Sequence, residues 1–333
     1  MKRYNDYAEE DLFSFNKINN NKIIIIVFLF LLIINNLNIK KYIKKIEYLQ
    51  HSINKNMKTI KNTKLDLMNN DIILNQQIAA ILFYVLNYKK NSSIYQLLEP
   101  KAIFGKKKVR IGAKKDGGYI LLNDFENIKI AYSFGINNEV SFDKDLADKN
   151  IDIFMYDHTI EKLPFENKRF HWKKIGLTEK MGKGNNMKTL YEFIQENGHS
   201  NEKNMILKID IDGQEWNVFN KISNDILTQF KYILVEFHFN NKFASHYSQV
   251  FKKINRNHQI FHLHCNNYGS IIYFDGNIIC SALEISFIIK NNNKFMKNND
   301  FFPIRNIDYK NNKNKIDMNL FLNIYQINKL LQK

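Results

Sequence analysis

The sequence predicts an α/β domain built on a mostly parallel, doubly wound sheet. Between about residues 95 and 290, segments rich in β-branched and aromatic residues alternate with segments of helical pattern. Strands separated by helices are typical of a parallel sheet. The last two strand-like segments have little helix between them, which indicates that the final strand runs antiparallel.

The expected elements follow one another along this region. Strands are expected over 128–135, 151–158, 170–178, 205–213, 232–239, 260–268 and 282–290, and helices over 140–149 and 187–197. Length and composition allow one such domain with appendages in a chain of 333 residues. We expect a polar tail at 1–22, a membrane anchor at 23–39, a helical stalk at 40–92, the α/β domain at 93–290 and a C-terminal extension at 291–333.

The positive charge of the chain lies mainly outside the α/β domain. Residues 101–290 hold 27 Lys and Arg against 22 Asp and Glu, so about +5 of the formal net charge of +16 lies there. A nucleic-acid-binding domain would concentrate basic residues on its fold, with a recognisable reader module. No such module is present, so we expect no nucleic-acid partner.

The apolar run Ile23–Ile34 predicts an anchor that holds the chain at a membrane. Twelve residues are short, because a bilayer core needs about 17–25, so the span would have to include Leu37 and Ile39. No small-residue cleavage site follows the run, which favours an uncleaved anchor over a signal peptide. A single-pass type II protein of the secretory pathway is expected, although the flanking lysines do not settle the orientation. A buried or interfacial helix is the alternative.

The segment after the anchor carries apolar residues at a 4-3 spacing. They are Ile39, Ile43, Ile46, Ile53, Met57, Ile60 and Leu67. Such a stripe predicts either a stalk that associates with itself or one amphipathic helix resting on the domain.

A candidate nucleotide site lies at the ends of the first two central strands. Gly135 stands at the exit of the first, and Asp157 ends the next strand 22 residues later. This is close to the spacing of about 20 at which such folds place a carboxylate against ribose hydroxyls. Composition and spacing alone would equally allow a nicotinamide enzyme.

Acids and histidines end the later strands. Alternation places Asp210 and Asp212 on one face, where close acids must bind a cation, hold a proton or meet a donor. The alternative is that one acid caps the following helix while the other faces solvent. Glu236 and His238 share a face by the same rule. His262 and His264 do likewise, and a metal would need three or more converging ligands. Strand histidines satisfied by neighbours are commoner, so no metal is expected.

Several stretches together resemble FkbM-type and related family 22 S-adenosylmethionine-dependent methyltransferases. They are "KKDGGYILL", "AYSFGINNEVSFDKDLA", "MYDHTI", "LKIDIDGQEWNVF", "ILVEFHF" and "HLHCNNYG" with "ALEISFI". The resemblance implies a Rossmann-like class I methyltransferase sheet and S-adenosylmethionine as the cofactor. The cofactor-binding residues that it implies are Ser133, Phe134, Gly135, Asn137, Asp157, His158, Asp116 and Tyr119, with Thr159 beside the adenine. Asn137 departs from the family, which usually has a second glycine there.

The acids and histidine at the strand ends are the candidates for the reacting side of the site, and the resemblance adds Asn266 and Asn267. Asp210 and His238 are the candidate bases, and the expected substrate contacts are Asp212, Glu236, Asn266 and Asn267. The acceptor would be a hydroxyl or carboxyl of a glycan, small molecule or protein. The alternative is a cofactor-binding or scaffold protein that keeps the fold without turnover.

Two features remain open. Cys265 and Cys280 lie 15 residues apart in the last strand regions, where they are either bridged or plain core residues. The extension is expected to form a loosely packed strap that ends in a helix near 320–331.

Overall fold

The computed structural model describes residues 93–182, 186–240, 246–274, 277–291, 293–300, 302–315 and 317. All of them belong to one compact unit. The expected polar tail, membrane anchor, stalk and C-terminal helix lie outside the described residues. Among the helices in the described part, none is long and apolar enough to cross a membrane.

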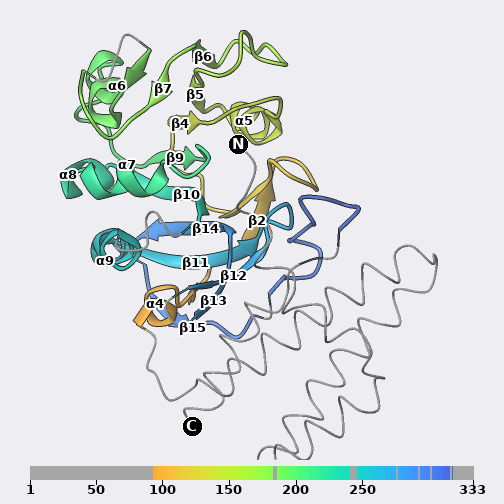
Figure 1. The fold of residues 1–333 in the computed structure, drawn as a ribbon. Helices are drawn as coiled ribbons and strands as arrows, with labels where there is room; N and C mark the ends of the chain where they lie inside the picture. Colours follow the sequence, from red (N-terminus) through yellow and green to blue (C-terminus); the bar gives the residue numbers. More distant parts are fainter. Residues whose placement is uncertain are drawn as a thin grey trace, which may run out of the picture. The chain divides into compact units, whose positions relative to one another are not determined.

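A seven-stranded sheet in the order β11-β14-β10-β9-β4-β5-β6 organises the domain (Figure 1). Its strands are β4 (Ile130–Phe134), β5 (Asp152–Tyr156), β6 (Phe170–Lys173), β9 (Met205–Ile209), β10 (Phe230–His238), β11 (His258–Cys265) and β14 (Ala282–Ile289). All neighbours pair in parallel except β14, which is antiparallel to both β10 and β11. The six parallel strands follow the doubly wound order 3-2-1-4-5-6, with β14 inserted before the last. The expected mostly parallel sheet with an antiparallel final strand is confirmed.

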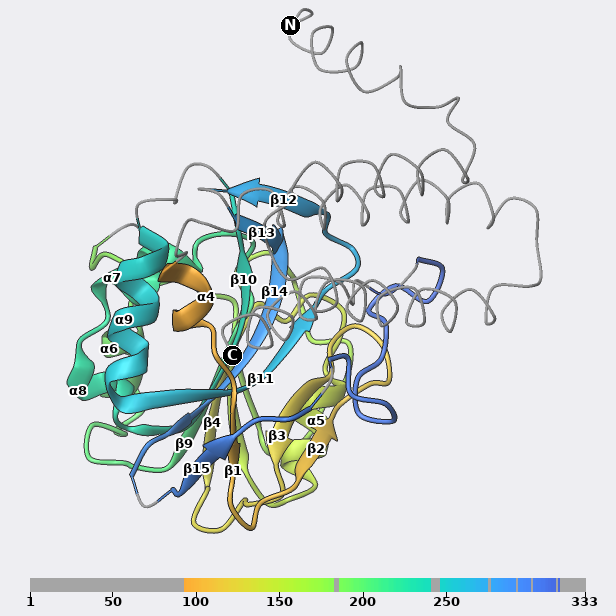
Figure 2. The ribbon, with the colours of Figure 1, turned by 90° about the horizontal axis from the view of Figure 1, so that it is seen from below.

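Each face of the sheet has its own cover (Figure 2). One face carries α4 (Ser93–Leu97), α6 (Leu190–Glu196), α7 (Glu215–Lys221), α8 (Asn224–Leu227) and α9 (Tyr247–Asn257). The other carries α5 (Ser141–Ala147) and the hairpin of β2 (Lys108–Ile111) and β3 (Tyr119–Leu122). Two buried apolar clusters result, the first around Trp216 and Phe237 and the second around Leu121 and Ile153. Central strands buried on both faces explain their nearly continuous apolar sequence.

Local sequence accounts for the helix boundaries. Thr189 and Glu192 form a capping box, because the Thr189 hydroxyl accepts from the Glu192 N–H and the Glu192 carboxylate accepts from the Thr189 N–H. The helix expected over 187–197 therefore begins at Leu190. In α9 the buried residues Tyr247, Val250, Phe251 and Ile254 follow the spacing of one helix face.

Small sheets join segments that are distant in the chain. β1 (Lys101–Ile103) pairs with β15 (Phe295–Lys297), so the start of the domain is tied to the C-terminal extension. β12 (Ile271–Phe274) and β13 (Asn277–Cys280) form a hairpin between β11 and β14, and β7 (Gly176–Leu177) pairs with β8 (Met187–Lys188). The strand expected over 170–178 is thus two strands, β6 and β7.

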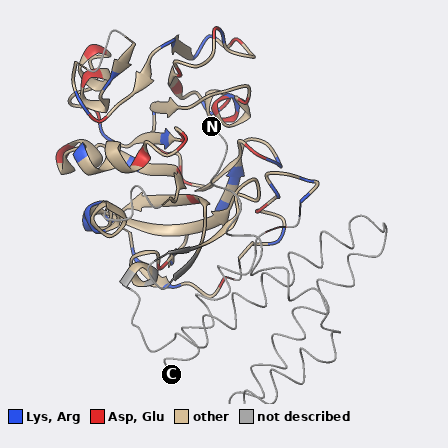
Figure 3. Ribbon diagram, in the orientation of Figure 1, with Lys and Arg blue, Asp and Glu red and all other residues tan. Residues whose placement is uncertain are grey.

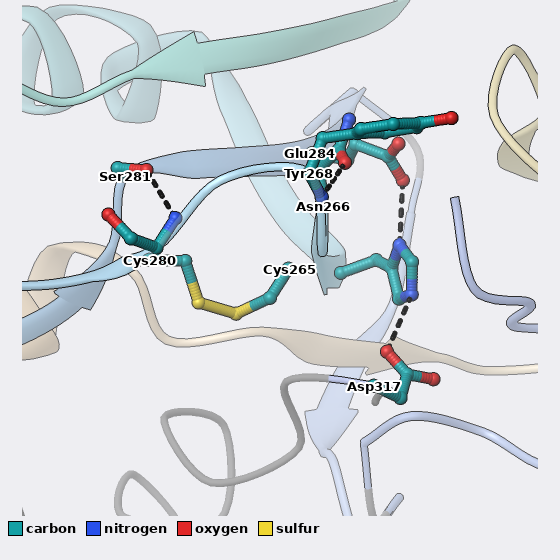
Figure 4. Close-up of a disulfide and its surroundings, with 9 residues drawn as sticks. Cys265, Asn266, Tyr268, Cys280, Ser281, Glu284 and Asp317 are labelled. Carbon is teal, nitrogen blue, oxygen red and sulfur yellow. Dashed lines mark hydrogen bonds and ion pairs between the residues drawn. A yellow bond between two sulfur atoms is a disulfide. The ribbon is translucent and has the colours of Figure 1, made fainter. Parts of the chain in front are cut away.

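A disulfide joins Cys265 at the end of β11 to Cys280 at the end of β13 (Figure 4). Their Cα atoms are 5.8 Å apart, and both side chains are buried. The bridge that the sequence left open is therefore present, and it closes the connection that contains the β12–β13 hairpin.

The C-terminal strap, defined as the described residues between 302 and 317, packs against the sheet. Phe302, Asp308 and Asn311 are buried. The expectation of loose packing is wrong, because side chains of the strap make hydrogen bonds to residues of β11, β14 and the β2–β3 connection. Basic and acidic residues are interspersed over the described elements (Figure 3), in keeping with solvated faces.

Candidate active site

A cavity of about 760 Å³ opens beyond the carboxyl ends of β4, β5 and β9. The strand order reverses between β4 and β9, and doubly wound sheets bind ligands at that edge. The volume lies within the range of about 300–1,000 Å³ typical of small-molecule sites. The lining residues are Gly135, Asn137, Tyr156, Asp157, His158, Thr159, Gly176, Leu177, Thr178, Glu179, Met187, Asp210, Ile211, Asp212, Gln214 and Asn217.

The loop after β4 forms one wall and needs the residues that it has. Gly135 has φ +74°, and a Cβ there would lie 1.6 Å from the backbone oxygen of Asp210. Only glycine fits this close approach of two strand ends. Asn137 has φ 49°, which confirms that asparagine accepts the left-handed backbone where the family usually has glycine.

Both carboxylate oxygens of Asp157 accept hydrogen bonds that hold this loop. One carboxylate oxygen accepts from the N–H groups of Ile136 and Asn137 at 2.8 and 2.9 Å. The other accepts from the N–H and hydroxyl of Thr159 at 2.8 and 2.6 Å. Burial alone would raise the pKa of Asp157, but these hydrogen bonds outweigh it and lower the pKa. A ribose hydroxyl would therefore have to replace a contact to Thr159, which is itself exposed.

The other residues expected at the loop divide into two groups. His158 is exposed and lines the cavity beside Gly176. Ser133 and Phe134 do not line it, because both side chains are buried within the sheet. Phe134 stacks on Tyr156 with ring centroids 5.3 Å apart. The sequence pattern identified the loop near the cavity. It could not show whether the side chains of Ser133 and Phe134, or only the nearby backbone, would reach the cavity.

The Asp210 carboxylate lies between the cavity and the polar groups of the buried residues Tyr119 and Lys208. Its side chain retains 30% exposure, and it lines the cavity. The Tyr119 hydroxyl donates to it at 3.3 Å, and the Lys208 ammonium lies 4.0 Å away. Burial and the neighbouring Glu236 raise the pKa of Asp210 well above its usual range, although Lys208 and His238 oppose the shift. Tyr119 thus reaches the site through Asp210 rather than through the cavity wall.

His238 lies between two carboxylates, a setting that does not favour the role of base that the sequence predicted. Its Nδ1 lies 3.2 Å from Glu215 and its Nε2 lies 3.4 Å from Glu236. Burial lowers its pKa, but the hydrogen bonds and charges of both carboxylates outweigh burial and raise the pKa to about 11. The imidazole is therefore protonated at neutral pH, and both its nitrogens are donors. Its role is to hold two buried acids together.

The two acids of "DIDG" do not share one face. β9 ends at Ile209, and Asp212 has φ 52°, so the alternation of a strand does not extend to it. Asp212 is fully exposed at the cavity rim, and the expected helix cap is absent because α7 has no side-chain cap. Instead Glu215 in the first turn of α7 accepts from the N–H groups of Ile211 and Gly213 at 2.9 and 3.1 Å.

The remaining expected contacts are directed away from the cavity. Asn266 donates to both oxygens of Glu236 at 3.0 and 3.1 Å. Asn267 bonds the strap at Asn312, and Asp116 accepts from Asn311 of the strap at 2.9 Å. None of these four side chains lines the cavity. These side chains bind one another or the strap outside the cavity. The strap is distant in the sequence, so the local sequence pattern could not reveal these partners.

Among the residues that the structure describes, two groups of side chains lie close enough to hold a metal ion. They are Asp210, Glu236 and His238, and Asp116, Glu236 and Glu284. The first needs an unprotonated His238, whose two nitrogens already face carboxylates. In the second the Asn266 amide already donates to Glu236, and its orientation is set because its oxygen accepts from the Tyr268 N–H at 2.9 Å. In both groups the acids thus already accept hydrogen bonds or ion pairs from protein side chains.

Lys208 is the site residue that sequence reasoning missed. It lies in the middle of the otherwise apolar segment "MILKI" of β9, and its side chain is buried. A lysine inside a strand buried on both faces is the signal that could have revealed it, because lysine is almost never fully buried without a partner.

Together these features define a doubly wound α/β domain with a cavity at its switch point, a glycine loop after the first strand and a carboxylate after the second. The profile of the methyltransferase FkbM domain matches residues 113–266. The match supports an FkbM-type methyltransferase domain in this part of the chain and confirms the resemblance found in the sequence.

Other known proteins add little to this assignment. No curated protein matches the chain. Among solved structures, one described as "Putative hemolysin from Streptococcus thermophilus" is 8% identical, covers 66% of this chain and 82% of its own, and has a TM-score of 0.26. That likeness is too weak to inform either fold or function.

Proposed function

We propose that this protein transfers a methyl group from S-adenosylmethionine to a hydroxyl group of its acceptor. The observation that carries the proposal is the Asp210 carboxylate, which lines the cavity and has a raised pKa. A general base works best when its pKa lies near the working pH, and burial moves a carboxylate in that direction. The FkbM family assignment supports the same reaction.

The residues around the cavity suit this cofactor. The left-handed loop at Gly135 and Asn137 lets the backbone approach a ligand, and His158 and Thr159 are exposed at the neighbouring wall. Acidic side chains on the wall suit a cofactor that carries positive charge. When bound, S-adenosylmethionine would supply an electrophilic methyl carbon.

The charges around Asp210 favour a hydroxyl acceptor over a carboxylate. Glu236 and Glu215 are buried close to Asp210, and both oppose further negative charge there. A carboxylate acceptor would be repelled and would need no base. A hydroxyl is neutral and must lose its proton as its oxygen bonds to the methyl carbon and the methyl–sulfur bond breaks, which would release S-adenosylhomocysteine. Asp210 would take that proton.

One observation favours a second candidate function, a scaffold without turnover. The carboxylate of Asp157 and the amides of Ile136 and Asn137 bind one another, so groups expected to meet the cofactor already have partners. Calorimetric titration of the full chain with S-adenosylmethionine and S-adenosylhomocysteine separates the candidates. Binding of both in the micromolar range is expected for an enzyme, and no binding of either would contradict the proposal.

We also propose that the domain works in an oxidising compartment while tethered to a membrane. The Cys265–Cys280 disulfide supports this, because such bonds persist in secretory and extracellular environments. The apolar run at 23–34 supplies the tether. Alkylation of the protein in cells under non-reducing conditions should leave both cysteines unmodified, and resistance to carbonate extraction tests the anchor. Free thiols in the folded protein, or full release by carbonate, would contradict these two proposals respectively.

A further inference from the structure

Lys208 of β9 is a buried cation beneath the loop that follows β4. Its side chain is 9% exposed. It lies two residues before Asp210, so the two side chains leave the strand on the same face. Removing an ammonium from water is costly unless other groups replace its hydration, so the contacts of Lys208 indicate its role.

The ammonium of Lys208 meets the loop and Asp210 together. Its Nζ donates to the carbonyl of Gly135 at 2.5 Å and, more weakly, to that of Phe134 at 3.4 Å. The same nitrogen lies 4.0 Å from the Asp210 carboxylate. The Asp210 N–H also donates to the Phe134 carbonyl at 3.1 Å, so backbone and side chain connect the same two strand ends.

The opposite side of this loop is held by an anion. Asp157 is also buried, and it accepts from the N–H of Ile136 at 2.8 Å. The Gly135 carbonyl and the Ile136 N–H belong to a single peptide unit. In a trans peptide these two groups point in opposite directions. One peptide plane is therefore fixed between a buried cation and a buried carboxylate.

We propose that Lys208 is a positioning residue that, with Asp157, clamps the Gly135–Ile136 peptide and couples this loop to the Asp210 carboxylate. The inference deepens the proposed function and rests on it for its catalytic meaning. The clamp sets the loop before any ligand arrives, and such preorganisation saves the ordering cost of binding. The same ammonium favours the charged form of the carboxylate that serves as base.

Lys208 is one of several charged groups that act on Asp210. Glu236 and Glu215 raise the pKa of Asp210 after burial itself, whereas Lys208 and His238 lower it. The Tyr119 hydroxyl also faces it and donates a hydrogen bond. Loss of Lys208 leaves His238 as the remaining cation among these groups, so the acidity of Asp210 should fall.

Lys208→Met in the full chain tests both halves of the clamp. We expect binding of S-adenosylhomocysteine, measured by calorimetry, to weaken about tenfold or more, because loss of a charge-assisted contact releases the loop. Amide hydrogen exchange in the peptide that covers residues 134–138 should accelerate at least tenfold. Carbon-13 labelling of aspartate should show Asp210 titrating about one pH unit or more higher.

Lys231→Met is the matched control. Lys231 is a similarly buried lysine on the neighbouring strand β10, and its ammonium pairs with Asp124 at 2.8 Å rather than with the loop. The control should lose stability to a similar extent, yet leave S-adenosylhomocysteine affinity, loop exchange and Asp210 titration within twofold or a few tenths of a pH unit of the unaltered protein.

The outcomes separate this inference from the proposed function. If the unaltered protein binds no S-adenosylhomocysteine, the proposed function fails, but loop exchange and Asp210 titration still test the clamp. Unchanged exchange and unchanged titration in Lys208→Met would overturn it. Should that variant not fold, Lys208→Gln replaces it, because its amide keeps a donor without charge. If the clamp exists, the pKa of Asp210 should then be higher in Lys208→Gln than in the unaltered protein. An unchanged pKa of Asp210 would overturn the inference.

Discussion

Two polar clusters lie side by side at the carboxyl end of the sheet, and they differ in what covers them. The cavity cluster consists of Asp210, Glu215, Glu236 and His238. The covered cluster consists of His262, His264, Glu284, Asp308 and Asp317. In both, two polar residues alternate with apolar ones along one strand, and the histidines among them face carboxylates, so their sequence patterns look alike.

The C-terminal strap makes the difference. Asp308 of the strap accepts from His262 at 2.8 Å, and Asp317 lies 3.7 Å from the second nitrogen of His264, whose first nitrogen lies 2.9 Å from Glu284 (Figure 4). In the described part of the chain no such segment covers Asp210, which remains partly exposed to the cavity. Histidines and carboxylates therefore have a structural role where the strap covers them. Where a cavity leaves them accessible, the same residue types can take part in catalysis.

The clusters are joined by one row of side chains. Glu284 of β14 is registered with Glu236 of β10 on one side and with His264 of β11 on the other. Like charges directly opposite one another in a sheet are destabilising. Asn266 and Asn311 offset the repulsion, since they donate to Glu236 and Glu284 respectively.

The largest expected effect is on the methylation rate, and it comes from a substitution in the cavity cluster alone. Asp210→Asn should lower the methylation rate by about 10²–10⁴, the usual scale for a general base, while cofactor affinity stays within about threefold. Release of labelled methyl groups from S-adenosylmethionine measures turnover, and Asp308→Asn in the covered cluster is the control. A variant with full rate would remove Asp210 from the chemistry.

The disulfide gives the next effect and tests whether the clusters are independent. Replacing Cys265 and Cys280 together by serine should lower the free energy of unfolding by about 3 kcal/mol, the scale for a closed loop of this length. Thermal and denaturant unfolding measure it. Cofactor affinity should stay within twofold. A tenfold loss would show that Asn266, next to Cys265, transmits the change to Glu236.

Removing the strap's acid should affect stability and leave chemistry intact. Asp308→Ala leaves His262 without its acceptor and removes the hydrogen bond from the Ile304 N–H. Buried hydrogen bonds to charged groups are worth about 1.5–3 kcal/mol, so a loss of that size is expected in denaturant unfolding. A rate that falls together with stability would contradict the separation of the two clusters.

A further expected effect is a dependence of stability on pH that both clusters share. The carboxylates around them outweigh burial and raise the pKa of His238 to about 11 and of His264 to about 10. The folded protein thus holds protons that the unfolded chain releases above about pH 6.5. Their contribution to stability is complete below that pH and declines as the pH rises toward 10 and 11. His264→Gln should flatten this decline in urea titrations, and an unchanged slope would contradict it.

Much of the fold could be predicted from the chain alone. The β-branched strand segments and their alternation with helices indicated the doubly wound sheet, because periodicity reports burial directly. Gly135, Asn137, Asp157 and Asp210, which the sequence marked as site candidates, line one cavity, since strand ends in such a sheet share one edge. These inferences needed only local pattern and a known topology.

Tertiary structure decided the roles. Only the fold brings Glu215 of α7 against His238 of β10 and makes the predicted base a bound cation. Lys208 and Asp157 meet the same peptide from opposite sides although they are far apart in sequence. Protonation and function depend on burial and on partners from distant segments, and a linear pattern records neither. The sequence by itself therefore determined the sheet and its binding edge, whereas three-dimensional packing decided which side chains there can hold, take or give up a proton.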